Sequence, residues 1–193
     1  MRLLISMRER EEEDALEKNY VRFFQERGFC IVPVTNNENA IDDLLREADG
    51  MVFTGGGDIG EQKNRDKVEG KMLDYAYDND VPVLGICRGM QFINHHLNGD
   101  LQRVKNHIRS KHRVYVNTIF KEKSYIVNSF HEYAINRIGE GLSVFAVTYR
   151  GTIEGIYNDL IIAVQWHPER ESVVTELDEN IINLFKDRIK ERK

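Results

Sequence analysis

The stretch Pro82-Val-Leu-Gly-Ile-Cys-Arg-Gly-Met-Gln91 joins an apolar run to a helical pattern. Residues 82–86 are short and apolar, which predicts a buried strand. From Met90 to Leu97 the apolar side chains recur at helical spacing, which predicts a helix that begins at about residue 88. Cys87 therefore falls on the turn between a strand and a helix.

Two glycines, Gly85 and Gly89, flank Cys87 at two residues on each side. Small neighbours let the backbone pass through a sharp turn that lifts one side chain clear of a sheet. The positive end of the following helix favours thiolate over thiol. The alternative is a buried, inert cysteine, but the glycines and Gln91, one helical turn further on, favour a nucleophile.

The first half of the chain alternates strand and helix patterns. Strands are predicted at 2–6, 29–34, 50–54 and 82–87, and helices at 14–27, 39–48 and 65–79. This alternation predicts a parallel sheet with helices on both faces and right-handed crossovers. The ligand crevice of such a sheet lies beyond the carboxyl ends of its strands. Residues 6–8, the glycine loop 54–57 and Cys87 would then share one rim.

The second half has mostly strand patterns. Strands are predicted at 114–119, 124–127, 142–149, 152–157 and 160–165, and a closing helix at 171–193. We find no linker, internal repeat or low-complexity tract, so we expect one domain over residues 1–193.

Composition narrows the functional classes. The net charge of −5 argues against a general nucleic-acid binder. No apolar run approaches the roughly 18 residues of a membrane span, and no signal peptide is visible. Two cysteines are too few for a disulfide framework, and Cys30, in a strand-like run, is expected to be buried. We expect a cytoplasmic protein without a membrane partner; the oligomeric state stays open, with a homodimer as one alternative.

A catalytic cysteine needs a base and a group that orients the base. Trp166-His-Pro-Glu169 follows the predicted strand 160–165 and so lies at a strand end. In an extended segment His167 and Glu169 can project to one side, so Glu169 could hold the imidazole that faces the sulfur. For a developing oxyanion, the backbone N–H of Arg88 and an N–H of the glycine loop are the expected donors.

Three motifs together resemble the class I glutamine amidotransferase superfamily: residues 85–91, residues 54–58 (Thr-Gly-Gly-Gly-Asp) and residues 165–169 (Gln-Trp-His-Pro-Glu). The three motifs occur in the same order as in that superfamily, and together they span nearly the whole chain. Arg88, the set Arg65-Asp-x-x-Glu69 and the set Asn128-Ser-x-His131 resemble its γ-glutamyl hydrolase branch, the peptidase C26 group.

The resemblance implies a flavodoxin-like, three-layer α/β/α fold with a mostly parallel central sheet, extended by antiparallel strands from the second half. It also implies a small-molecule γ-glutamyl substrate, cleaved through a thioester to glutamate and an amine or a phosphoramidate. The implied roles are Cys87 as nucleophile, His167 as base, Glu169 as orienting acid, and the N–H groups of Gly56 and Arg88 as oxyanion hole. Gln91 and the backbone around Ser129 and Phe130 would hold the glutamyl α-groups, and His131 is a further expected substrate-binding residue.

Two departures concern the leaving group. The branch often has His-His-Gln where this chain has His131-Glu-Tyr133, and the loop after Gly57 is trimmed. The predicted rim also carries four cations, Arg8, Arg10, Lys63 and Arg65. If they face the crevice they favour an anionic leaving group; the alternative is pairing with neighbouring carboxylates.

The remaining histidines and the glycine loop do not indicate a metal or phosphate site. His95, His96, His107 and His112 lack the spacing of a metal site, and the glycine loop is not followed by Lys-Ser/Thr, so we expect no metal and no cofactor. Three alternative functions stay open: a glutaminase subunit that passes ammonia to a synthetase, a non-catalytic binding or stress protein on the same fold, and an α/β-hydrolase. In an α/β-hydrolase the acid precedes the histidine in the chain, whereas Glu169 follows it.

Overall fold

The structure, a computed structural model, describes residues 1–117, 119–121, 123–171 and 174–192. Its strands are β1 (Arg2–Ser6), β2 (Arg8–Glu9), β3 (Asp14–Ala15), β4 (Cys30–Val34), β5 (Gly50–Phe53), β6 (Val83–Ile86), β7 (Asp100–Arg103), β8 (Ile108–Val116), β9 (Lys123–Phe130), β10 (Tyr133–Arg137), β11 (Ser143–Thr148), β12 (Ile153–Tyr157) and β13 (Ile161–Val164). Its helices are α1 (Lys18–Gln25), α2 (Asp42–Arg46), α3 (Lys63–Asp78), α4 (Arg88–His96) and α5 (Glu176–Glu191), with 3₁₀ turns η1 (Glu38–Ala40) and η2 (Pro168–Arg170).

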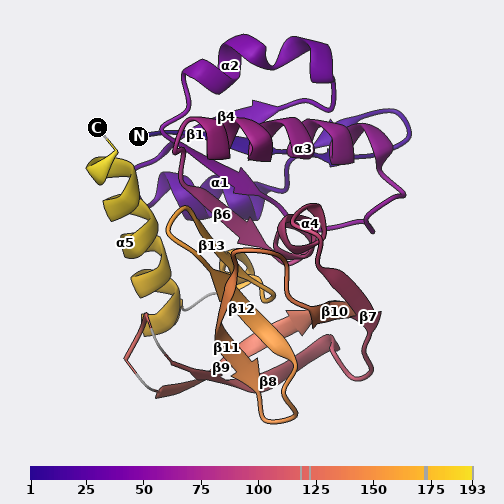
Figure 1. Cartoon of the computed structure of the whole chain (residues 1–193), viewed down its shortest axis with the longest axis vertical. Coiled ribbons are helices and arrows are strands. Elements are labelled where there is room, and N and C mark those ends of the chain that lie inside the picture. Colours follow the sequence, from indigo (N-terminus) through magenta and orange to yellow (C-terminus); the bar gives the residue numbers. More distant parts are fainter. Residues whose placement is uncertain (118, 122, 172–173, 193) are drawn as a thin grey trace.

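One mixed sheet of eleven strands organises the chain (Figure 1). Its parallel part has the order β4-β1-β5-β6-β13. The antiparallel strands β12, β11, β8 and β9 continue it beyond β13, and β10 pairs with both β12 and β7. The mostly parallel sheet with an antiparallel extension confirms the predicted fold class.

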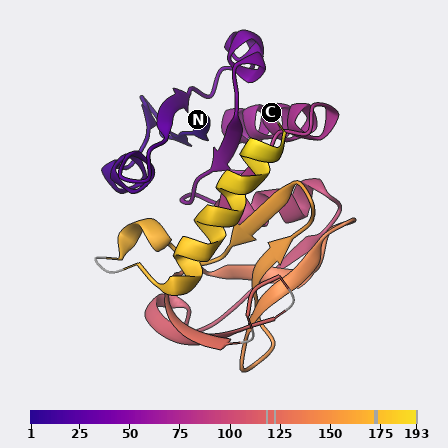
Figure 2. The same ribbon diagram turned by 90° about the vertical axis from the view of Figure 1, so that its left-hand side faces the viewer.

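Two hydrophobic clusters lie on opposite faces of the parallel strands. Along β1, Leu3 and Ile5 belong to one cluster and Leu4 to the other, as the period of two in a strand requires. The first cluster includes side chains of α1 and α5, and the second includes side chains of α2, α3 and α4. Figure 2 shows α5 running from the N-terminal strands toward the strands of the second half. Both faces are therefore covered, which gives the three layers.

The predicted helix 14–27 is wrong in its first turn. Asp14 and Ala15 instead pair with Glu9 and Arg8 in the β2–β3 hairpin, and the Asp14 carboxylate accepts hydrogen bonds from Asn36. These long-range pairings outweigh helix propensity, so α1 begins at Lys18. The predicted helix 39–48 is likewise divided between η1 and α2.

Other differences lie in the second half and on the sheet edge. Strands β7 and β10 were not predicted, and the closing helix begins at Glu176, where Thr175 and Asp178 form a capping box. The predicted strand 114–119 and helix 171–193 also include residues 118, 172–173 and 193, which lie outside the described residues. Cys30 is exposed rather than buried because β4 is the edge strand of the sheet.

Candidate active site

Cys87 lies on a strained turn between β6 and α4. Its backbone φ is 54° and ψ is −107°, a conformation that a residue other than glycine rarely adopts. Its N–H donates to the Val164 carbonyl at 2.7 Å, and its carbonyl accepts from the Gln91 N–H at 3.1 Å. A Cβ on Gly89 would come within 2.1 Å of the Phe53 carbonyl oxygen. Glycine at position 89 is therefore a steric requirement of this turn.

His167 and Glu169 lie beyond the end of β13, the strand that neighbours β6. The His167 Nδ1 lies 2.6 Å from the Glu169 Oε1, and both residues are almost fully buried. The Gln165 amide donates to the Cys87 sulfur at 3.7 Å. A Cβ on Gly55 would lie 2.7 Å from the His167 ring and 3.3 Å from the Cys87 Cβ. Cys87 and His167 can therefore take these positions only if residue 55 is glycine.

The pKa of His167 is raised from its ordinary value of 6.5 to about 10. Burial alone would lower this pKa, but the negative charges of Cys87 and Glu169 on either side of the ring outweigh it. The site therefore favours a protonated imidazolium on His167 beside the Cys87 sulfur. A cation next to a cysteine is a common means of activating it as a nucleophile.

Asn128 at the end of β9 holds the backbone of His167. Its amide donates to the His167 carbonyl and its oxygen accepts from the His167 N–H, both at 2.8 Å. The same amide contacts Glu171 at 2.9 Å. The antiparallel extension thus positions His167, the expected base, a role that sequence reasoning did not assign to Asn128.

The two expected oxyanion donors both line the cleft. Gly56 has a φ of +88° and follows β5, and Arg88 is the first residue of α4. The N–H of a first helical residue has no partner within its own helix. Gly55, one residue before the donor, is fixed in turn because its N–H donates to the Tyr20 hydroxyl at 2.8 Å.

Arg65 does not lie where the sequence predicted. Its side chain is fully buried beneath the glycine loop and is absent from the cleft lining. It donates to the Thr54 carbonyl at 2.6 Å and to the Gly56 carbonyl at 2.7 Å. It therefore holds the carbonyl side of the loop that presents the Gly56 N–H, and it is a positioning residue rather than a leaving-group contact.

The Arg65 and Arg88 side chains share one buried carboxylate. Glu69 accepts from the Arg65 Nε at 2.9 Å and from the Arg88 guanidinium, which also pairs with Asp66. The Arg65-Asp-x-x-Glu69 spacing and Arg88, which suggested the γ-glutamyl hydrolase branch, thus form a network that ties α3 to α4.

A cleft of about 330 Å³ opens over this site. Its lining consists of Arg8, Gly56, Gly57, Asp58, Cys87, Arg88, Gln91, Phe130, His131, Glu132, Tyr133, His167 and Arg170. It includes the expected substrate residues Gln91, Phe130 and His131.

Among these, the Gln91 amide donates to the Tyr133 carbonyl at 2.8 Å and to the Gln165 oxygen at 3.3 Å. The expected Ser129 is buried and does not line the cleft; its hydroxyl donates to the His107 carbonyl at 2.6 Å.

Of the four rim cations predicted, Arg8 alone lines the cleft. Arg10 pairs with Glu13 on the surface at 2.7 Å. Arg170, which sequence reasoning missed, takes the second cationic position: its guanidinium lies 4.9 Å from the centre of the Phe130 ring. Its place directly after Glu169 was the signal that could have found it.

A flavodoxin-like sheet that brings Cys87, His167 and Glu169 together at neighbouring strand ends has the class I glutamine amidotransferase fold. The chain belongs to the peptidase C26 family, whose sequence profile matches residues 5–169.

It is 30% identical to the glutamine amidotransferase-like protein YvdE of Lactococcus lactis subsp. lactis, over 87% of this chain and 86% of that protein. It is 34% identical to the gamma-glutamyl-CDP-amidate hydrolase of Campylobacter jejuni subsp. jejuni, over 63% of this chain and 62% of that protein.

The fold is also similar to the glutaminase domain of the Trypanosoma brucei CTPS with bound acivicin. That structure has a TM-score of 0.75 at 18% identity, over all of this chain and 94% of the other. Among the described residues, we find no helix long and apolar enough to cross a bilayer.

Proposed function

We propose that this protein is a hydrolase that cleaves γ-glutamyl amide bonds through a thioester on Cys87. The observation that carries the proposal is the His167 imidazole held between Cys87 and Glu169, with its pKa raised to about 10. The family membership supports hydrolysis, and the family resemblance supports the γ-glutamyl group.

In the first half of the reaction the Cys87 thiolate attacks the γ-carbonyl carbon, and the oxygen becomes an oxyanion near the Gly56 and Arg88 N–H groups. The His167 imidazolium gives its proton to the departing nitrogen as the C–N bond breaks. This leaves a γ-glutamyl thioester, a free amine and a neutral imidazole.

In the second half His167 takes a proton from water, and the resulting hydroxide attacks the thioester carbonyl. The C–S bond breaks, glutamate leaves, and the thiolate and imidazolium are restored. Glu169 carries no transferred proton; it holds the ring and stabilises its positive charge.

We further propose an anionic leaving group, such as a nucleotide phosphoramidate of the kind used in capsule biosynthesis. Arg8 and Arg170 support it, since both line the cleft and arginine binds phosphate in a bidentate manner. Asp58 and Glu132 line the same cleft, so the anion would have to lie on the side of the two arginines. The similarity to the Campylobacter hydrolase points in the same direction.

The test is glutamate release from a panel of γ-glutamyl amides by the protein alone, with the Cys87→Ala variant as the blank. The panel contains glutamine, γ-glutamyl-aminobutyrate and a γ-glutamyl nucleotide amidate. The hydrolase proposal predicts turnover without a partner protein. A protein idle until a synthetase is added would instead be a glutaminase subunit.

The leaving-group proposal has its own comparison. At low salt, kcat/KM for the nucleotide amidate should exceed that for γ-glutamyl-aminobutyrate by about tenfold or more, equal to about 1.4 kcal/mol. High salt should reduce this advantage. Arg170→Ala and Arg8→Ala should each raise KM for the amidate, while Arg10→Ala, on the surface, serves as control. If both cleft variants act like the control, the anionic leaving group is wrong and the hydrolase assignment stands.

A further inference from the structure

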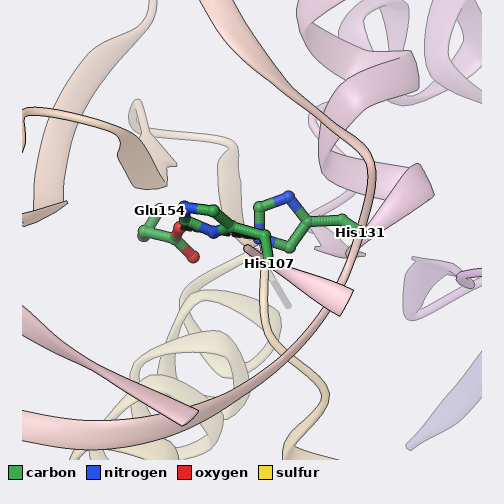
Figure 3. A group of neighbouring side chains, drawn as sticks. All are labelled: His107, His131 and Glu154. Carbon is green, nitrogen blue, oxygen red and sulfur yellow. Dashed lines mark hydrogen bonds and ion pairs between the residues drawn. The ribbon is translucent and has the colours of Figure 1, made fainter. Parts of the chain in front are cut away.

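Three possible metal ligands, His107, His131 and Glu154, come together in the second half of the chain (Figure 3). His107 precedes β8, His131 lies between β9 and β10, and Glu154 is in β12. They are separated by more than 20 residues along the chain, which is why sequence spacing predicted no metal centre. Pairing of β8 with β9 and of β10 with β12 brings them together.

The distances between the three donor atoms fit one small cation. The His107 Nδ1 and the His131 Nε2 are 3.2 Å apart, and each lies 3.6 Å from the Glu154 Oε1. Ligands at about 2.0–2.1 Å from a tetrahedral zinc ion lie roughly 3.3–3.4 Å from one another. The separations of the three donor atoms therefore match those between three ligands of a tetrahedral zinc ion, so the side chains would not have to move to bind one.

The carboxylate in this cluster is buried without a hydrogen bond. Glu154 has no exposed surface, and neither of its oxygens has a hydrogen-bond partner among the described residues. His112 contributes a further ring nitrogen 3.3 Å from the same oxygen, and that nitrogen is also without a hydrogen bond there. A buried carboxylate at these distances from imidazoles must be compensated by positive charge, which either a protonated ring or a cation bound among them would supply.

The imidazole of His131 is oriented for ligation. Its Nδ1 lies 2.9 Å from the Tyr133 carbonyl oxygen. Because a carbonyl can only accept, the proton of the neutral ring is on Nδ1 and the lone pair on Nε2 points at the cluster. Such a second hydrogen bond to a backbone carbonyl is typical of histidines that bind zinc.

We propose that His107, His131 and Glu154 form a binding site for one divalent transition-metal ion, best suited to Zn²⁺. Two histidines and one carboxylate are a known zinc ligand set and leave a fourth position for water. Access would come from a second cavity, which is lined by His107 and His112 among other residues.

The site would support the substrate cleft through His131. His131 itself lines the cleft, and the Tyr133 carbonyl that fixes its ring also accepts from the Gln91 amide. A bound ion would therefore stabilise the turn between β9 and β10 that forms one wall of the cleft. Its role is positioning, because the ion would contact His131 rather than the reacting atoms.

The test uses full-length protein with Cys30→Ser and Cys87→Ser, which removes thiolates that bind zinc by themselves. Equilibrium dialysis should find one Zn²⁺ per chain, and Co²⁺ should give the visible absorption of a four-coordinate site. His107→Ala and Glu154→Gln should each weaken binding by at least tenfold. His95→Ala, which removes an exposed histidine of α4, should bind as the parent does.

Circular dichroism and thermal unfolding accompany each variant. If Glu154→Gln does not fold, His107→Ala decides the question, because the His107 side chain is 14% exposed and its removal disturbs the core less. Added Zn²⁺ should raise the unfolding temperature of the parent and of His95→Ala but not of His107→Ala. Absence of stoichiometric binding in the folded parent, or parent-like binding by His107→Ala, would overturn the proposal and leave an ion-paired histidine cluster.

Discussion

Replacing Glu69 by Gln removes the carboxylate charge that, within the described part of the chain, the Arg65 and Arg88 guanidinium groups share. Glu69 is fully buried between them, and Arg65 is fully buried as well. Gln can still accept one hydrogen bond but carries no charge. Among the described residues, Arg88 would then keep Asp66 as its ion-pair partner, with a side chain that is 20% exposed, and Arg65 would keep no carboxylate partner.

The expected loss of unfolding free energy is about 3–5 kcal/mol, the range for removing one partner of a buried ion pair. The surface pair Arg10–Glu13, with side chains 49% and 61% exposed, is the matched control. Glu13→Gln should cost less than about 1 kcal/mol because water already screens that pair. Urea unfolding followed by circular dichroism measures both losses on one scale.

The loss should also depend on pH. Burial would raise the pKa of Glu69, but the charges of Arg65 and Arg88 outweigh it, so the pKa is lowered. A lowered pKa gives stability that is complete above the unfolded-state value of about 4.3 and is lost as pH falls through the folded-state value. The gap between wild type and Glu69→Gln should therefore be full at pH 7 and narrow in acid.

Glu69→Gln also tests the role of the network in catalysis. Arg65 holds the Gly56 carbonyl, so kcat should fall even in the folded fraction. A loss of stability no larger than that of Glu13→Gln, with unchanged activity, would refute this account of the buried network.

Four further predictions concern Cys87, His167, Glu169 and the adjoining Gly55. Cys87→Ala should keep the fold and lower kcat/KM at least about a thousandfold, and a glutamine-like electrophile should add its mass to Cys87 in the wild type rather than to exposed Cys30. His167→Ala should lower kcat more than Glu169→Gln, since Gln still holds the ring; equal losses would give Glu169 another role. The wild-type rate should fall as pH rises through about 10, where His167 loses its proton, and Glu169→Gln should move this limb to lower pH, because it removes a charge that raises the pKa of His167. Gly55→Ala should lower kcat about 100-fold, because its Cβ would lie 2.7 Å from the His167 ring; wild-type kinetics would contradict the steric argument.

Local patterns in the sequence determined the parallel half of the fold and the chemistry at its strand ends. An apolar run, a glycine-flanked cysteine and a helical period lie within 16 residues, so the turn at Cys87 could be predicted from local rules. His167 could be predicted for the same reason, since its motif directly follows the apolar strand β13.

Only the tertiary structure decided which side chains meet across the sheet. The sequence places Arg65 among the cations expected at the cleft rim, but its position at the start of α3 brings it under the glycine loop, where it is fully buried. Asp14 begins a stretch with a helical sequence pattern, but in the structure it pairs with Glu9 in a β-hairpin and accepts a hydrogen bond from Asn36. Cys30 looks like a core residue until the strand order places β4 at the edge.

The His107, His131 and Glu154 cluster is the clearest case. Each residue stands in a different local pattern, and none of those patterns indicates a ligand. Strand pairing and register between segments far apart in the chain set the 3.2–3.6 Å distances among them. Periodicity reports which face of a strand is buried, but it carries no information about which strands become neighbours, and that choice depends on packing of the whole domain.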